Sequence, residues 1–248
     1  MPGSVAPAAQ RYAPLKAQVG DRALLHLKDL EVYAGDTPPS DYSVEMELAA
    51  LDRFADSLHL DRFHLAGYSG GGFIALAFAG TRPQRLLSLA LFEPAMIPGA
   101  MTPDEQALAD TLRTQLGGLD GAEFMSAFVR LQLKPGVPPP PPPPQQVPGM
   151  EKRPAGIAAM MRSFFAFRFN RDLLRAGDFP AFLGYGDLTH EVESVKASVL
   201  AGLFADVRVK RFAGVHHFVP PGQIYTAEHA QALENLWARA SGPELALE

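Results

Sequence analysis

Apolar runs recur along the chain at intervals that suit strands. Continuous or alternating apolar residues predict strands at 22–33, 63–66, 86–92, from about residue 180, and at 207–211. The run at 86–92, LLSLALF, is apolar at nearly every position, which is typical of a strand buried on both faces of a parallel sheet.

Segments of helical spacing lie between these runs. Apolar residues three and four positions apart predict helices at 44–58, at 192–203 and after a capping Thr226. Ser43 can cap the first of them, and Glu45 and Glu47 then lie in the first turn, where they favour the helix dipole. Small and apolar residues at 73–79 predict a helix that packs closely under a sheet and ends before Pro83. This alternation predicts an α/β fold with a mostly parallel sheet flanked by helices.

The alternation stops between residues 98 and 177. We therefore predict a core formed by 1–97 and 178–248, with 98–177 inserted as a helical cap. The insertion carries seven consecutive prolines at 138–144, a polyproline II segment that serves as a rigid spacer or as a ligand for proline-binding modules. Its apolar cluster at 160–169 predicts packing of the cap onto the core, with Met161 and Phe165 as candidates to contact an acyl or aromatic group.

The composition of the chain limits which classes of protein it can belong to. The 248 residues are 47% hydrophobic, enough for one substantial core, and carry a net charge of -5. Acidic and basic residues are interspersed, so no basic stripe predicts nucleic-acid binding and no polybasic patch predicts membrane binding. The chain has no cysteine for disulfides or thiolate chemistry. It shows neither a leader pattern nor a membrane span, so we expect a cytoplasmic protein that acts on a small molecule, in an oligomeric state left open.

The segment 62–72, RFHLAGYSGGG, holds the strongest candidate for chemistry. Gly67, Ser69 and Gly71 form a GxSxG pattern between a predicted strand and a predicted helix. A side chain at either glycine would collide with the neighbouring strand or helix in so tight a turn. The hydroxyl of Ser69 is thereby exposed at the carboxyl edge of the sheet, with Tyr68 beside it as a candidate substrate contact.

With this pattern the chain resembles the α/β-hydrolase superfamily over nearly its whole length. Members place the nucleophilic serine, an acid and a histidine in that chain order. The segment 212–220, FAGVHHFVP, follows a predicted strand and is similar to the family's histidine loop. The resemblance implies His217 as the catalytic base, with His216 as the second candidate.

Two residues are candidates for the acid. The family's usual position follows the strand that starts near residue 180, but Thr189 occupies that place and Asp187 lies two residues early. Glu93 ends the apolar run 86–92, where some branches of the family place their acid, and is followed by Pro94. We favour Glu93 narrowly over Asp187.

The first residues, 1–15, resemble the family segment that directly follows a His-Gly turn. The resemblance then implies that Met1 occupies the position of one oxyanion donor and that the first three strands of the fold are missing. The strand at 22–33 would have to pair across the gap, or that region would be loose. The backbone amide of Gly70 is the other expected oxyanion donor.

Together these features predict a serine hydrolase that cleaves a small or medium-sized, largely apolar ester or related acyl compound without a metal or organic cofactor. A carbon-carbon hydrolase or a lyase that uses the same residues is an alternative. A binding protein without catalytic activity is another.

Overall fold

The computed structural model describes residues 1–248 except 5, 142–148, 219–223 and 242–248. Its central sheet has four strands in the order β1-β2-β3-β4, and every neighbouring pair is parallel. The strands are β1 (Phe63–Tyr68), β2 (Leu86–Phe92), β3 (Ala181–Gly186) and β4 (Val207–Phe212). The expected α/β fold with a parallel sheet is confirmed.

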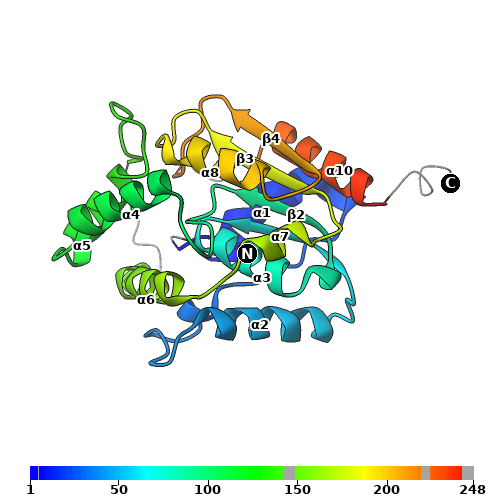
Figure 1. The fold of residues 1–248 in the computed structure, drawn as a ribbon, viewed down its shortest axis with the longest axis horizontal. Coiled ribbons are helices and arrows are strands. Elements are labelled where there is room, and N and C mark those ends of the chain that lie inside the picture. Colours follow the sequence, from blue (N-terminus) through cyan, green and yellow to red (C-terminus); the bar gives the residue numbers. More distant parts are fainter. Residues whose placement is uncertain (5, 142–148, 219–223, 242–248) are drawn as a thin grey trace.

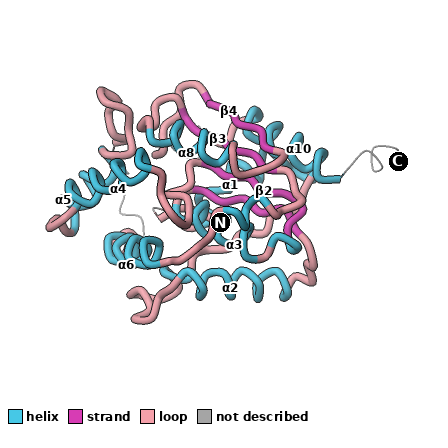
Figure 2. Tube along the Cα trace, viewed as in Figure 1, coloured by secondary structure: helices cyan, strands magenta, loops and turns pink. Residues whose placement is uncertain are grey.

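Helices cover both faces of this sheet (Figures 1 and 2). Those of the core are α1 (Ala8–Val19), α2 (Val44–Ser57), α3 (Gly70–Thr81), α8 (Val192–Ala201) and α10 (Ala227–Ser241). Residues 98–177, the expected cap insertion, contain α4 (Pro103–Leu116), α5 (Gly121–Arg130), α6 (Arg153–Ala166) and the short α7 (Asp172–Arg175). In Figure 1, α4, α5 and α6 lie beyond one end of the sheet. The polyproline run is described only as far as residue 141.

The alternation of side chains along each strand divides the core in two. Leu89 and Leu91 of β2 belong to a cluster with α2 and α3, whereas Ala90 and Phe92 belong to a second cluster with α1 and α10. Neighbouring strand residues point to opposite faces of a sheet, so a strand covered on both faces is apolar at nearly every position. This explains the continuous apolar run of β2.

The strand expected at 22–33 is wrong. Short 3-10 turns occupy Gly20–Arg22 and Glu31–Tyr33, and 23–30 forms no ladder with another described strand. The side chains of 23–28 instead line a cavity of about 530 Å³, whose opposite wall includes β1. An apolar run becomes a strand only where a neighbour accepts its backbone hydrogen bonds, and β1 lies across the cavity from it.

Met1 bonds to the edge of β1 that faces this cavity. Its amino group donates to the Ala66 carbonyl at 2.6 Å, and its own carbonyl accepts from the Tyr68 N–H at 3.1 Å. These two bonds repeat the pattern of a parallel ladder. Burial lowers the pKa of the Met1 amino group to about 5. Met1 thus pairs with β1 as a neighbouring parallel strand would. The pairing lies near the carboxyl end of β1, which leads to Ser69.

The start of α2 differs in one respect from the expectation. Ser43 caps the helix as expected and accepts a hydrogen bond from the Met46 N–H at 3.2 Å. Glu47, however, is buried and accepts from the N–H groups of Glu31 and Val32 at 3.0 and 3.2 Å. Its main contact is therefore with the turn at 31–33, which it ties to the helix.

Arg171 joins the two ends of the cap insertion. Its guanidinium donates to both carboxylate oxygens of Glu105 at 2.7 and 2.9 Å, and to the carbonyls of Ile97 and Pro98 at 3.1 and 3.0 Å. The ion pair is largely buried. A buried pair of this kind resists separation, because either charge alone would be left without a partner.

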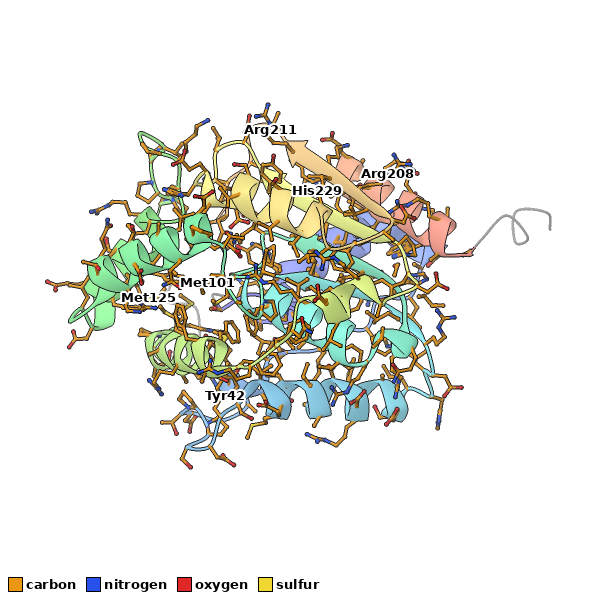
Figure 3. All side chains as sticks on the ribbon, viewed as in Figure 1. Tyr42, Met101, Met125, Arg208, Arg211 and His229 are labelled. Atoms are coloured by element: carbon orange, nitrogen blue, oxygen red, sulfur yellow. The ribbon has the colours of Figure 1, made fainter. Side chains whose placement is uncertain are left out.

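The far edge of the sheet, β4, is exposed and charged. Arg208 and Arg211 extend outward from it (Figure 3). Charged side chains on an edge strand discourage pairing with another chain. Across the described part of the chain, we find no helix with the length and apolar character needed to cross a membrane.

Candidate active site

Ser69 occupies a tight turn between β1 and α3. Its backbone has φ 52° and ψ -119°, a conformation that side-chain-bearing residues rarely adopt. A β-carbon at Gly67 would lie 2.5 Å from the Gly71 carbonyl oxygen, and one at Gly71 would lie 2.4 Å from the Pro2 carbonyl oxygen. The turn therefore requires glycine at both positions, which is the spacing that the sequence pattern indicated.

The backbone of Ser69 is bonded to the end of the neighbouring strand. Its N–H donates to the Phe92 carbonyl at 3.2 Å, and its carbonyl accepts from the Ala95 N–H at 2.8 Å. Glu93 lies between these two partners. The position of the serine is thus fixed relative to that of the acid by the register of β1 and β2.

His217 lies between the two side chains. With Nδ1 protonated, it donates to the Glu93 carboxylate at 2.7 Å, while its Nε2 accepts from the Ser69 hydroxyl at 3.1 Å. All three side chains are buried. A serine, an imidazole and a carboxylate connected in this order can activate the serine oxygen as a nucleophile.

The second oxygen of Glu93 is held by the turn after β3. It accepts from the Gly186 N–H at 2.7 Å and from the Thr189 hydroxyl at 2.6 Å. Thr189 therefore occupies the expected acid position and serves as a hydrogen-bond donor to the acid from the other strand. Glu93 itself has φ 46°, so β2 ends abruptly at this residue.

Asp187 has a different set of contacts. Its carboxylate accepts from the Gly214 N–H at 2.8 Å in the turn that leads to His217. The structure brings Ser69, His217 and Glu93 together, and it places Asp187 on the loop behind them.

His216, the second candidate for the base, has other contacts. It is half-buried, and its Nδ1 accepts from the Phe218 N–H at 3.1 Å.

The charge states of Glu93 and His217 are each set by opposing effects. Burial alone would raise the pKa of Glu93, but hydrogen bonds from His217, Thr189 and the Gly186 N–H hold it below its usual value. Burial lowers the pKa of His217, against the attraction of the Glu93 carboxylate. At neutral pH the pair is therefore a carboxylate beside a neutral imidazole.

Tyr68 packs against His217 and holds its position. Its ring is buried and stacks on that of His217 with centroids 4.8 Å apart, and its hydroxyl donates to the His217 carbonyl. The guanidinium carbon of Arg11, on α1, lies 3.6 Å from the centroid of the Tyr68 ring. Tyr68 does not line the cavity beside Ser69, which corrects its expected place as a substrate contact.

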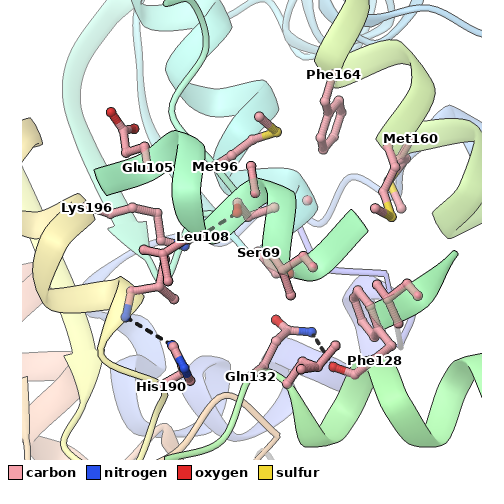
Figure 4. Close-up of a pocket in the computed structure, with 18 of the residues that line it drawn as sticks. Ser69, Met96, Glu105, Leu108, Phe128, Gln132, Met160, Phe164, His190 and Lys196 are labelled. Atoms are coloured by element: carbon pink, nitrogen blue, oxygen red, sulfur yellow. Dashed lines mark hydrogen bonds between the residues drawn. The ribbon is translucent and has the colours of Figure 1, made fainter. Parts of the chain in front are cut away.

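A cavity of about 160 Å³ opens onto Ser69 (Figure 4). Apolar side chains of the cap helices form most of its wall: Leu108, Leu112, Phe128, Met160, Met161, Phe164 and Phe165. Met161 and Phe165, the two expected contacts, are among them. The polar end includes Lys196 of α8, which is buried, pairs with Glu193 at 2.5 Å and donates to the Pro94 carbonyl. The cavity suits an apolar group placed over the serine.

The two expected oxyanion donors differ in their surroundings. Gly70 begins α3 and lines the cavity, and the first N–H groups of a helix have no partner within the helix. The amino group of Met1 donates to Ala66 on β1. A role for Met1 beside the oxyanion stays a prediction.

The lowered pKa of His217 predicts the pH dependence of catalysis. If the neutral imidazole takes the serine proton during ester hydrolysis, kcat/KM for a neutral ester should be level at neutral pH and fall as the pH drops through this pKa. We expect the midpoint of the acid limb below the ordinary 6.5. Burial raises the pKa of Glu193, at the polar end of the cavity, to about 7. Glu193 could also titrate in this range, so Glu193→Gln is the control and should leave the acid limb in place. A midpoint of the acid limb above 6.5 would contradict its assignment to His217.

A family model described as alpha/beta hydrolase fold matches residues 32–220, a range that contains Ser69, Glu93 and His217. A search of curated proteins finds no match. Solved structures with a similar fold include MenH from S. aureus, with a TM-score of 0.73 and 16% identity over 98% of this chain and 93% of that chain.

Two esterase structures are also similar. A thermophilic esterase from Thermogutta terrifontis, with malate bound, has a TM-score of 0.68 and 18% identity over 96% of this chain and 88% of its own. The carboxylesterase CesB from Bacillus subtilis has a TM-score of 0.61 and 18% identity over 93% of this chain and 80% of its own. At such identities the likeness concerns the fold.

Proposed function

Because the chain belongs to the alpha/beta hydrolase fold family, we propose that it is a serine hydrolase, of carboxylesterase-like type, that cleaves a small or medium-sized, largely apolar ester or related acyl compound. One observation carries the proposal. The hydrogen-bonded series from Ser69 through His217 to Glu93 ends at an apolar cavity that opens onto the serine.

In the first half of the reaction, His217 Nε2 takes the proton of Ser69 as the serine oxygen bonds to the acyl carbon. The Glu93 carboxylate stabilises the imidazolium that forms and holds the ring in the required tautomer. The Gly70 N–H is a donor for the negative charge that develops on the carbonyl oxygen. The imidazolium then protonates the leaving alcohol, and an acyl group remains on Ser69.

In the second half, His217 deprotonates a water molecule, which attacks the acyl carbon. The bond to the Ser69 oxygen breaks, the serine regains its proton from the imidazolium, and the acid is released. In this proposal the steps use Ser69, His217, Glu93 and the Gly70 N–H.

The side chains that line the cavity favour binding of an apolar acyl group. Side chains such as Leu112, Met161 and Phe165 present carbon and sulfur to a bound group, and burial of each methylene contributes about 0.8 kcal/mol. A charged group placed among them would lose its hydration without a partner. Neutral esters with short to medium apolar acyl chains are therefore the first substrates to assay.

A fluorophosphonate probe tests this function directly. The probe should phosphonylate Ser69, and digestion followed by mass spectrometry should locate the adduct on the peptide that contains this residue. Prior reaction with the probe should abolish hydrolysis of p-nitrophenyl esters in proportion to labelling. Absence of labelling would favour a binding protein without catalytic activity. Labelling without ester hydrolysis would favour a carbon-carbon hydrolase or lyase.

A further inference from the structure

We propose that the hydroxyl of Ser4 is an oxyanion donor, and that together with the Gly70 N–H it holds the carbonyl oxygen of the substrate during attack by Ser69. The inference rests on the proposed function, since it assigns one more residue to the same reaction. It gives a catalytic role to a side chain that the sequence pattern did not indicate.

The backbone before Ser4 passes directly over the nucleophile. A β-carbon added at Gly3 would lie 2.9 Å from the Ser69 β-carbon and 2.7 Å from the Tyr68 ring. The carbonyl of Pro2 accepts from the Gly71 N–H at 3.1 Å, one residue past Gly70. Residues 2–4 are thus packed against the first turn of α3, and Ser4 follows the closest point of approach to Ser69.

The side chain of Ser4 borders the cavity at the Gly70 amide. Ser4, Ser69 and Gly70 all line the cavity, and a β-carbon added at Gly70 would lie 3.4 Å from the Ser4 hydroxyl oxygen. The Ser4 hydroxyl and the backbone of Gly70 therefore border the same part of the cavity, beside Ser69. Oxyanion donors work when two of them converge on one point, and side-chain hydroxyls serve in this role as backbone amides do.

The Ser4 hydroxyl can donate to a substrate. Ser4 is buried within the protein and lines the cavity, and the Tyr33 hydroxyl lies near its side chain. A serine hydroxyl can accept a hydrogen bond from such a neighbour and still donate its own proton. The O–H of Ser4 can therefore be directed at an oxygen atom bound in the cavity.

The position of Ser4 is fixed by the cap. The guanidinium of Arg153, the first residue of α6, donates to the Ser4 carbonyl at 3.2 Å. Arg153 is itself buried, and its guanidinium carbon lies 4.1 Å from the centroid of the Tyr33 ring. The donor is therefore held in place before substrate binds, as an electrostatic contribution to catalysis requires.

The step that Ser4 assists is the formation of the tetrahedral intermediate. The Ser69 oxygen forms a bond to the acyl carbon, its proton passes to His217 Nε2, and the π electrons of the carbonyl move onto the oxygen. Ser4 and Gly70 each donate a hydrogen bond to that oxygen and transfer no proton. The hydrogen bonds strengthen as the charge develops, so Ser4 should affect kcat more than KM.

Ser4→Ala provides the test, with two readouts on the same preparation. The rate of phosphonylation of Ser69 by a fluorophosphonate and kcat for p-nitrophenyl butyrate should both fall about 100-fold, the usual effect of removing one oxyanion donor, with KM nearly unchanged. Ser4→Thr, which keeps the hydroxyl, should recover most of the rate. Ser57→Ala removes a surface serine hydroxyl bonded at 2.7 Å to the Phe54 carbonyl, and should match the unaltered protein in both readouts.

The possible outcomes separate the two proposals. If the unaltered protein labels at Ser69 and Ser4→Ala labels and turns over at the same rate, the role of Ser4 is overturned and the proposed function stands. If the unaltered protein neither labels nor hydrolyses esters, the proposed function is overturned, and the role of Ser4 with it. A fall in thermal stability that Ser4→Thr shares, without recovery of rate, would make Ser4 a structural residue and overturn the proposal.

Discussion

Ser69→Ala should lower kcat for ester hydrolysis about 10⁶-fold, because the change removes the atom that forms the acyl intermediate. The loss should be nearly that of removing the whole catalytic series, since His217 and Glu93 act only through the serine. Initial rates on p-nitrophenyl butyrate, with phosphonate labelling to count active molecules, measure the effect.

The same variant should fold like the original. Alanine keeps the β-carbon in the tight turn, and the serine hydroxyl makes its hydrogen bond to His217 alone among the described residues. Circular dichroism melting should show little change. More than about a tenth of the original activity in a pure sample would refute the nucleophile assignment, since loss of a true nucleophile leaves far less.

Glu93→Gln should lower kcat about 10⁴-fold. The amide cannot stabilise the imidazolium of His217. Its oxygen is still required by the Gly186 N–H and the Thr189 hydroxyl, so its NH₂ group faces Nδ1 and favours the wrong tautomer. The measurement is kcat at a pH above the acid limb, with melting to check the fold.

Asp187→Asn is the matched control for the acid. The asparagine oxygen can still accept from the Gly214 N–H, so the turn before the histidine loop is kept and turnover should fall only modestly. The opposite ranking of the two variants would move the acid to Asp187. Equal and small effects would mean that His217 works without a carboxylate partner.

The sequence predicted the parts of the molecule that depend on local pattern. The β1 strand, the turn at Ser69 and α3 follow each other within a few residues, and steric demands at Gly67 and Gly71 leave few alternatives. The two-sided burial of β2 could likewise be predicted, because its residues from Leu89 to Phe92 alternate between two apolar clusters.

The choice between Glu93 and Asp187 could not be made from the sequence. It depends on whether the loop after β3 brings a carboxylate within reach of the histidine, which the local sequence does not determine. In the structure, Thr189 of this loop donates to one oxygen of Glu93, and His217 donates to the other. A threonine in place of the usual acid was the available signal, but its partner lies on another strand.

The strand expected at 22–33 shows another limit. The pattern of its side chains suits a strand, yet backbone pairing depends on which segment lies alongside, and here a cavity separates it from β1. The sequence analysis missed the contact of Arg11 with the Tyr68 ring for a similar reason. A single arginine on a helix is usually a surface residue, and only the fold brings this one against the Tyr68 ring.

The contacts of Arg171 with Glu105, Ile97 and Pro98 have a consequence for how the sequence of residues 98–177 can change in evolution. Arg171 holds the entry and exit of this segment together with one guanidinium, so the chain between them forms a closed loop. Closure of a longer loop adds only a slowly rising entropy cost, about 0.6 kcal/mol for each doubling of length. Insertions within 98–177 can therefore accumulate at little expense to the core. The apolar wall of the cavity can therefore change in this segment while Ser69, Glu93 and His217 keep their geometry.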